Sequence, residues 1–350
     1  APRSPLEGGG KRLAAVLGAA KIAMLGALRD AFFFALGTLF VTWVATFTAI
    51  NGNILPVLSL LLLAPIAPSA HAATLRSLAN TGWGAILHYA EAVGGLSPVL
   101  SCAGPPLSSL RGNKIVLSNH VCMTDGLAIF AIADRAGMLG NLRFFAKRVL
   151  LYTPILGLAA KFLNFVFLTR QWDRDKHSLR KVFGDMVDHA DERNFWMVVF
   201  PEGTRICTAG KLLESQKFSR ERGLPVMQHV MVPRSKGLVA TLRALRGSID
   251  GVIDVTIGYP KQELKQQQEH VVGSVRPGLL DVLWKRRGPW PVHIHVRVIP
   301  VGDLPEDDEG VRPWLQRLFE DKNRLLEALH STGSFPNTPD SPKPNSLGGG

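Results

Sequence analysis

Residues 114–137 read KIVLSNHVCMTDGLAIFAIADRAG, and this stretch decides which kind of fold the sequence can adopt. The apolar run 115–117 predicts a short buried β-strand. The polar pair 118–119 predicts a loop, and the residues 124–135 predict a helix that ends at Gly137. A buried strand that runs through a loop into a helix is typical of an α/β sheet, whose sites lie at strand ends.

The later sequence keeps this alternation of strands and helices. Residues 196–200, 252–259 and 292–301 are rich in apolar and β-branched residues and predict further strands. We therefore expect an α/β fold with a mixed sheet flanked by helices. Residues 311–330 predict a polar amphipathic helix, and residues 331–350, rich in Pro, Ser and Gly, predict a disordered tail.

A long uncharged stretch precedes the α/β region. Residues 31–70 contain no formally charged side chain, and residues 31–50 can cross a bilayer as one helix, because a span needs about 20 apolar residues. The turn-forming residues 51–53 and the shorter apolar run 54–67 then predict a transmembrane or re-entrant helical hairpin. The expected parts are a basic N-terminal segment at 1–30, a membrane-embedded hairpin at 31–70, an α/β domain at 71–330 and the tail at 331–350.

Basic residues lie on the N-terminal side of this uncharged stretch, at positions 11, 12, 21 and 29. The positive-inside rule then places the N-terminus in the cytosol, together with the rest of the chain if the hairpin returns. Two other interpretations compete. Ala70-His71-Ala72 resembles a signal-peptidase site, although the apolar region of a signal has only about 7–15 residues. The stretch could also form buried core helices, but its unbroken lack of charge argues against them.

The chain is strongly basic and apolar at the same time. Its 40 Lys and Arg against 28 Asp and Glu give a formal net charge of +12, which favours an anionic partner. The hydrophobic content of 46% and the lack of a basic cluster interleaved with aromatic residues favour a membrane over nucleic acid. Cys102, Cys122 and Cys207 are odd in number and widely spaced, so they indicate neither a disulfide framework nor a zinc site.

His120 and Asp125 could form a catalytic pair. The two side chains can meet if His120 lies in the loop and Asp125 lies in the first turn of the helix, whereas on one ideal helix they would diverge. The carboxylate would then accept a hydrogen bond from Nδ1 and leave Nε2 free as a general base. Taken alone, however, this spacing favours an ordinary loop histidine.

A second polar segment, FPEGTR at residues 200–205, follows a predicted strand. Gly203 permits close approach of the backbone, Thr204 offers a hydroxyl, and Arg205 offers a planar guanidinium suited to a phosphate. This composition predicts an anion-binding loop. Taken alone, the segment would also suit a plain strand-to-helix turn with a solvated arginine.

Together, the two segments resemble motifs I and III of the glycerolipid acyltransferase family. The first motif is carried by Asn119-His120 with Asp125, and the third by residues 200–205. Residues 165–175, FVFLTRQWDRD, look like the second motif, with Lys147, Pro154 and Gly157 in its lead-in. Residues 223–225 and 232–237 look like the fourth. The order and spacing are most similar to the branch that contains 1-acylglycerol-3-phosphate acyltransferases and lysocardiolipin acyltransferases.

The resemblance implies one acyltransferase domain at 71–330, with His120 as the base and Asp125 as its orienting partner. It gives acceptor binding to the motif residues and the acyl-donor side to Pro233 and its neighbours. The substrate-binding residues that it implies are Asn119, Lys147, Arg170, Glu202, Gly203, Thr204, Arg205 and Pro233. The chemistry needs neither a metal nor a cofactor, because acyl-CoA is a co-substrate, and Cys122 is expected to serve packing.

The implied reaction transfers an acyl group from acyl-CoA to the free hydroxyl of 1-acylglycerol-3-phosphate and gives phosphatidate. Arg205 favours a phosphate monoester acceptor. The expected location is the endoplasmic reticulum membrane, with the catalytic domain in the cytosol. The alternatives are another lysophospholipid acceptor, such as lysocardiolipin or lysophosphatidylinositol, and a non-enzymatic basic membrane scaffold. Nucleic acid is not an expected partner.

Overall fold

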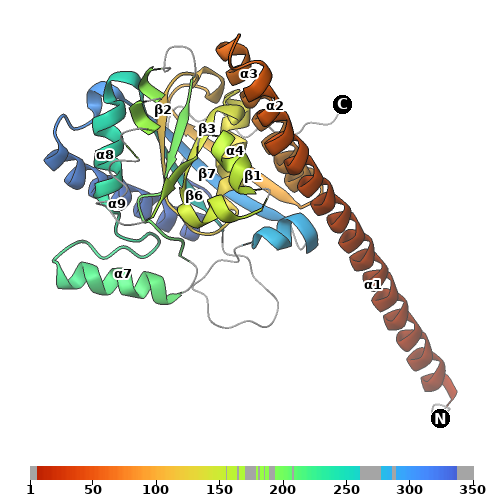
Figure 1. Ribbon diagram of the computed structural model, residues 1–350. Coiled ribbons are helices and arrows are strands. Elements are labelled where there is room, and N and C mark those ends of the chain that lie inside the picture. Colours follow the sequence, from red (N-terminus) through yellow and green to blue (C-terminus); the bar gives the residue numbers. More distant parts are fainter. Residues whose placement is uncertain are drawn as a thin grey trace.

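A seven-stranded mixed sheet forms the centre of the protein in this computed structural model (Figure 1). Its strands are β1 (Leu96–Ala103), β2 (Lys114–Ser118), β3 (Leu142–Lys147), β4 (Val166–Leu168), β5 (Trp196–Val199), β6 (Gly251–Gly258) and β7 (Trp290–Pro300). They lie in the order β1-β7-β6-β2-β5-β3-β4, and β6 pairs with β7 in the antiparallel sense while the other neighbours are parallel. The expected α/β fold with a mixed sheet flanked by helices is confirmed.

Helices cover both faces of this sheet, and a long helix extends away from it (Figure 1). They are α1 (Leu6–Ala49), α2 (Leu55–Leu62), α3 (Pro68–Ala92), α4 (Asp125–Arg135), α5 (Leu156–Phe162), α7 (Ala209–Glu221), α8 (Ser235–Leu245) and α9 (Asp308–Thr332). The residues that the structure describes are 6–154, 156–163, 165–169, 179, 182–184, 186–188, 194–206, 209–260, 277–285 and 289–336.

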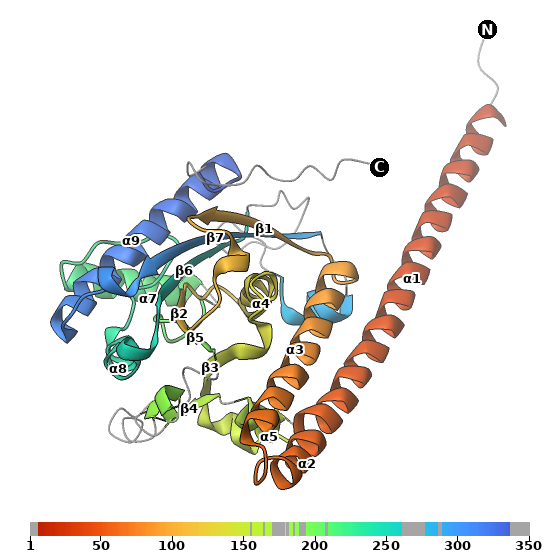
Figure 2. The ribbon, with the colours of Figure 1, turned by 90° about the horizontal axis from the view of Figure 1, so that it is seen from above.

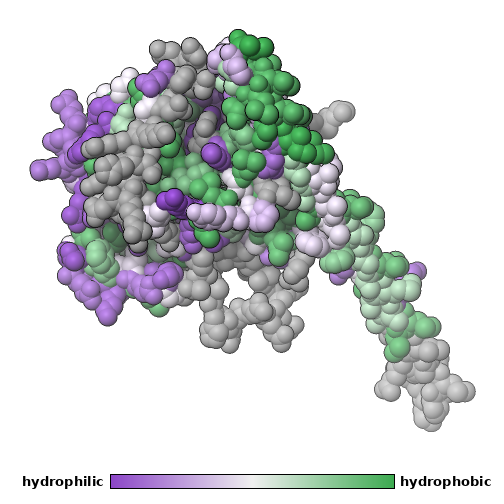
Figure 3. Space-filling view, viewed as in Figure 1, coloured by the Kyte–Doolittle hydropathy of each residue, from purple (hydrophilic) through white to green (hydrophobic). Residues whose placement is uncertain are grey.

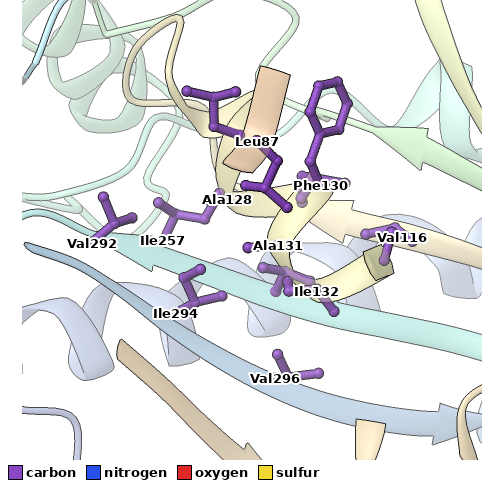
Figure 4. Close-up of a cluster of buried hydrophobic side chains, with 14 of the residues drawn as sticks. Leu87, Val116, Ala128, Phe130, Ala131, Ile132, Ile257, Val292, Ile294 and Val296 are labelled. Carbon is purple, nitrogen blue, oxygen red and sulfur yellow. The ribbon is translucent and has the colours of Figure 1, made fainter. Parts of the chain in front are cut away.

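Two apolar cores lie on opposite faces of the sheet. On one face, Ala128, Ala131 and Ile132 of α4 pack against the strands, as Figure 4 shows. On the other face, α8 and α9 contribute a second cluster that includes Leu242 and Phe319. Because successive side chains of a strand point to opposite faces, each central strand supplies both cores. Both faces of the sheet are therefore closed to water, and its strand ends remain for binding.

The direction of the strands determines where a site can form. The strands β2, β3, β4, β5 and β6 run in the same direction, so their carboxyl ends lie along one edge of the sheet. The strands β2 and β5 are direct neighbours, with Leu117 paired to Val199. The two loops that follow these strands therefore begin side by side, although they lie far apart in the sequence.

The N-terminal helices form a hairpin, but its turn differs from the expected one. The residues 51–53, which were expected to form the turn, belong to a π-helical segment (Ile50–Ile54) that joins α1 to α2 without a reversal. The chain reverses at residues 63–67, and α3 then returns beside α1 (Figure 2). The second arm of the hairpin is therefore α3, so the predicted turn position is wrong.

Local hydrogen bonds explain this difference. The side-chain amides of Asn51 and Asn53 donate to the carbonyls of Phe47 and Thr48, at 3.3 and 2.7 Å, so two residues typical of turns satisfy the helix instead. Pro56 lies in the first turn of α2, where the missing N–H costs little. Asn51 and Asn53, although typical of turns, therefore do not reverse the chain at the end of α1.

The exposed surface of this hairpin indicates membrane anchoring. Among the described residues, one helix, from Val16 to Leu62, is long and apolar enough to cross a membrane, and 6% of its most apolar 18-residue stretch is buried within the protein. Leu61 and Leu62 are each 66% exposed, and Figure 3 shows apolar surface over α2 and the adjoining part of α1. The alternative of buried core helices is therefore contradicted. Residues 70–72 lie inside α3, where His71 Nδ1 is 2.8 Å from Ser59 Oγ of α2.

The expected C-terminal helix is present as α9. Asp307 caps its start by accepting a hydrogen bond from the amide of Gly310, and Gly333, with φ of 81°, ends it. The helix includes the first two residues of the expected tail, and residues 337–350 of that tail lie outside the described part of the chain.

The packing of the hairpin on the α/β domain predicts opposite effects for two glycine substitutions. A Cβ atom at Gly52 would lie 2.8 Å from the Cβ atom of Ala159 in α5, whereas a Cβ atom at Gly26 in α1 would meet nothing within 4 Å. Gly26→Ala should stabilise the protein by up to about 1 kcal/mol through helix propensity. Gly52→Ala should destabilise it by about 1–3 kcal/mol through overpacking. Thermal unfolding in one detergent checks both, and an equal gain for the two variants would contradict this packing.

Candidate active site

His120 and Asp125 meet at the carboxyl edge of the sheet. His120 lies in the loop after β2, and Asp125 is the first residue of α4, so the loop folds the imidazole back onto the start of the helix. The distance from His120 Nδ1 to Asp125 Oδ2 is 2.9 Å. With the proton on Nδ1, the imidazole donates to the carboxylate, and Nε2 then carries the free lone pair of a base. The His120 side chain is 21% exposed, so solvent and a substrate can reach it.

The Asp125 carboxylate is held by several donors. Its Oδ2 atom accepts hydrogen bonds from the amides of Val121 and Cys122, at 2.6 and 2.9 Å, and its Oδ1 atom accepts one from the Tyr259 hydroxyl at 2.8 Å. The carboxylate is fully buried and lies at a helix N-terminus, where the helix dipole favours a negative charge. These hydrogen bonds hold the Asp125 carboxylate in one orientation, and the carboxylate in turn orients the His120 ring.

Tyr259 was not identified from the sequence. It lies directly after β6, and burial raises the pKa of its hydroxyl well above the ordinary value, so the phenol stays protonated and acts as a donor. A polar residue at the carboxyl end of a predicted strand, on the same edge as His120, is the signal that could have found it. The contact also joins β6 to the start of α4.

Phe200, which directly follows β5, supports the imidazole. Its ring stacks on the His120 ring, with centroids 4.1 Å apart and planes inclined by 22°. The loop after β5 also contacts the backbone of His120. Glu202 Oε1 accepts from the His120 amide at 3.3 Å, and the Ile206 amide donates to the His120 carbonyl at 3.1 Å. Two loops that are distant in sequence therefore form one unit around this histidine.

Asn119 has a different place from the one expected for a substrate-binding residue. Its side chain is fully buried. The amide nitrogen donates to the Ile257 carbonyl at 2.9 Å, and the amide oxygen accepts from the Ile257 amide at 2.8 Å. This pair of bonds mimics one rung of a sheet and joins the loop after β2 to β6. In this structure the Asn119 amide serves the backbone of β6, and its contact with a substrate stays a prediction.

The glycine of the second loop adopts a conformation that other residues rarely adopt. Gly203 has φ of 70°, and the space above it is bordered by the Arg234 side chain, whose atoms would lie 3.5–3.7 Å from an added Cβ atom. The Arg234 amide also donates to the Pro201 carbonyl at 2.8 Å. The structure thus brings Arg234 to this loop, whereas the sequence had grouped it with the donor side. Thr204 and Arg205 are partly exposed beside it.

The other expected binding residues lie on different segments of the chain. Lys147 lies at the carboxyl end of β3 on the same edge of the sheet, and it is exposed. Pro233 is partly exposed and lies two residues before the start of α8. Arg170 lies outside the described residues, as do Trp172, Asp173 and Asp175 of the second motif. Within the described ranges, no group of three or more His, Cys, Asp or Glu side chains could hold a metal ion.

Cys122 is a poor nucleophile in this environment. Burial and the negative charge of Asp125 raise the pKa of its thiol to about 12. Its sulfur lies 2.8 Å from the Thr124 hydroxyl and 3.5 Å from Asp125 Oδ1. A thiol that remains protonated at neutral pH cannot attack efficiently. The geometry therefore supports a packing role for Cys122.

The contact between Tyr259 and Asp125 predicts a loss of stability when the hydroxyl is removed. Tyr259→Phe leaves a buried carboxylate without one of its donors, which should cost about 1.5–3 kcal/mol. The matched control Tyr152→Phe removes the same atom from a side chain that is 75% exposed, and it should change little. Apparent melting temperatures measured at one scan rate compare the two. Equal melting temperatures would mean that the hydroxyl does not support Asp125.

Comparisons with known proteins place these residues in a family. Residues 101–259 match the model of the acyltransferase family, and residues 285–347 match the model of the acyltransferase C-terminus. The chain is 34% identical over 223 residues to a probable 1-acyl-sn-glycerol-3-phosphate acyltransferase 5 of Arabidopsis thaliana, covering 64% of this chain and 55% of that protein. It is 33% identical over 229 residues to the human 1-acyl-sn-glycerol-3-phosphate acyltransferase delta, covering 65% and 56%.

The chain thus spans little more than half the length of the curated relatives that it matches. Among solved structures, it is similar to the 1-acyl-sn-glycerophosphate acyltransferase PlsC of Thermotoga maritima, at 18% identity and a TM-score of 0.48, covering 86% of this chain and 97% of the other. The first family model contains both His120 and Asp125 as well as the whole loop after β5. This chain belongs to the acyltransferase family.

Proposed function

We propose that this protein transfers an acyl group from acyl-CoA to the free hydroxyl of 1-acylglycerol-3-phosphate and so forms phosphatidate. The observation that carries the proposal is the buried Asp125 carboxylate bonded to His120 Nδ1, directly beside a glycine-containing loop that carries Arg205 and contacts Arg234. A base and cationic groups at one strand edge suit an acceptor that offers both a hydroxyl and a phosphate. The names of the relatives support the same acceptor.

The proposed reaction needs one proton transfer in each direction. His120 Nε2 takes the proton from the acceptor hydroxyl as the oxygen attacks the carbonyl carbon of the thioester. The resulting imidazolium is stabilised by Asp125, and the tetrahedral intermediate collapses by breaking the C–S bond. The thiolate of CoA leaves and receives the proton from Nε2, so that the imidazole returns to its starting state. The neutral thiol of Cys122 supports this direct transfer over a covalent thioester on the enzyme.

The phosphate of the acceptor has several candidate partners. Arg205 offers paired donors, and the Arg234 side chain lies against Gly203, with atoms 3.5–3.7 Å from the position of an added Cβ atom. Lys147 adds a third cation at the end of β3. A phosphate monoester carries up to two negative charges, so a guanidinium fork suits it better than it suits a phosphodiester. This difference favours lysophosphatidate over lysocardiolipin or lysophosphatidylinositol.

The acyl chains have an apolar space available. A cavity of about 220 Å³ lies between the hairpin and α5. Its described lining is uncharged and includes Trp43, Phe47, Trp83, Leu156, Leu163 and Phe165. Such a cavity suits a hydrocarbon chain, because burying each methylene group contributes about 0.8 kcal/mol. The hairpin would therefore help to bind a lipid substrate in addition to anchoring the protein.

Exposed apolar side chains near the site indicate how a membrane lipid would reach it. The segment after β3 exposes Val149, Tyr152 and Leu156, at 68%, 75% and 50%, beside the hairpin that carries α2. Apolar side chains at the edge that carries His120 would let a lipid acceptor reach the site from the bilayer. The endoplasmic reticulum, with the catalytic domain in the cytosol, remains the proposed location.

The proposed reaction predicts that His120→Ala abolishes transfer without loss of folding. The removal of a general base lowers the rate by roughly 10²–10⁴. Purified protein in detergent, given acyl-CoA and a panel of lysophospholipids, is assayed by the release of CoA. His88→Ala, which removes an exposed histidine of α3, is the control and should keep wild-type rates. Wild-type activity in His120→Ala would exclude the mechanism, and a preference for lysocardiolipin or lysophosphatidylinositol would exclude the proposed acceptor. Wild-type protein that transfers to no acceptor would favour the scaffold.

The acceptor-binding role of Arg205 predicts a selective change in KM. Arg205→Ala should raise the KM for lysophosphatidate by roughly ten-fold to a hundred-fold, because each hydrogen bond to a charged group contributes about 1.5–3 kcal/mol. The KM for acyl-CoA should stay nearly constant, and Arg205→Lys should recover part of the loss. Arg220→Ala, at an exposed site on α7, is the matched control. A selective loss of acyl-CoA binding would instead assign Arg205 to the donor.

A further inference from the structure

A buried lysine on the C-terminal helix lies beneath the catalytic end of the sheet. Lys322 of α9 is fully buried, although α9 packs on the sheet mainly through apolar side chains such as Leu318 and Phe319. An ammonium group in such a layer is costly unless charges and hydrogen-bond acceptors surround it. Its position therefore requires an explanation beyond the apolar packing of the helix.

The Lys322 ammonium has three partners on two strands. It forms an ion pair with Asp254 of β6, which is itself 1% exposed. It also donates to the Val255 carbonyl of β6 at 2.6 Å and to the Leu117 carbonyl of β2 at 3.4 Å. Asp254 is further bonded to Arg297 of β7 at 2.9 Å. One side chain of α9 thus joins the neighbouring strands β2 and β6 from the face opposite α4.

These two strands lead directly to the groups that hold the catalytic pair. Leu117 lies three residues before His120 in the chain. Val255 lies two residues before Ile257, whose amide and carbonyl hold Asn119, and four residues before Tyr259, which donates to Asp125. A shift of β2 against β6 would therefore separate His120 from the support of Asp125.

The charge of Lys322 also acts on the second loop. Burial lowers the pKa of Lys322, and the carboxylates of Asp254 and, to a smaller extent, Glu202 oppose this shift. Glu202 accepts the hydrogen bond from the His120 amide. The ammonium is therefore within electrostatic range of a carboxylate that contacts the backbone of the catalytic histidine.

We propose that Lys322 is a positioning residue for acyl transfer, which fixes β2 against β6 and thereby holds His120 in line with Asp125. It touches neither substrate nor the reacting atoms, and its effect passes through the backbone. The C-terminal region, which has its own family model at residues 285–347, then contributes to the active site through this one side chain. The kinetic part of this proposal rests on the proposed acyltransferase function.

The test exchanges both partners of the ion pair. Lys322→Met with Asp254→Asn keeps side chains of similar size and leaves no unpaired buried charge, so the fold should be retained. We expect kcat to fall by roughly ten-fold to a hundred-fold, because small displacements of catalytic groups are that costly. The KM values of both substrates should change little. A merely structural role would lower the melting temperature and leave the kcat of the folded fraction unchanged.

A matched control tests whether the loss of any ion pair of α9 lowers kcat, and a second variant is available if the first does not fold. Arg243→Met with Asp308→Asn removes another ion pair of α9, at its exposed N-terminal end, and should leave kcat unchanged. If the first pair variant does not fold, Lys322→Gln alone retains the Asp254 pairing with Arg297, and it should still lower kcat with constant KM. A wild-type kcat in either folded Lys322 variant would overturn the proposal.

Amide hydrogen exchange tests the positioning without any assay of activity. In the folded Lys322 variant, peptides covering residues 117–125 should exchange faster, since the amides of Val121 and Cys122 are bonded to Asp125. Peptides from β3 should exchange as in the wild type. If the wild type transfers no acyl group, the proposed function fails, but the exchange measurement still tests whether Lys322 holds residues 117–125 in position. Unchanged exchange at residues 117–125 would refute its positioning role.

Discussion

The buried carboxylate of Asp125 is the constraint on which the candidate active site depends. A charged group without access to water is stable only when donors surround it, and here these donors come from the loop after β2, from Tyr259 after β6 and from the imidazole itself. Each donor that stabilises the charge also fixes a segment of backbone. The hydrogen bonds that stabilise this one carboxylate therefore also fix the position of His120 relative to Asp125.

The topology of the sheet explains why these donors converge. Because β2, β5 and β6 are parallel neighbours, their carboxyl ends deliver His120, the loop with Glu202 and Tyr259 to one edge. The antiparallel β7 lies on the other side of β6 and places Arg297 beside Asp321 of α9. Apolar burial on both faces keeps the strands in register. The candidate site thus lies at the edge where the parallel strands end and loops begin.

Much of this arrangement could be predicted from local sequence. A buried strand followed by a loop and a helix places the loop residues at the carboxyl edge of a sheet. That succession was sufficient for His120 with Asp125 and for the loop at Gly203. Three features escaped prediction for physical reasons. Asn51 and Asn53 bond backward along their own helix, which only the whole helix reveals. Asn119 bonds to a strand that lies far away in sequence, and the same is true of Tyr259. A single sequence indicates that Tyr259 ends a strand on this edge, but it does not indicate which partner either side chain bonds.

Two of the buried polar clusters form layers on opposite faces of the sheet and have different partners. The layer beside α4 contains Asp125, which bonds the imidazole directly, and Tyr259, which donates to Asp125. The layer beside α9 contains Asp254 and Lys322, and its hydrogen bonds reach the strand backbone. Replacing a buried ion pair with apolar residues is often neutral for stability, so stability alone does not account for the second layer. Its bonds to β2 and β6 define the register of strands that the first layer requires, and this geometric dependence connects the C-terminal helix to the chemistry at His120.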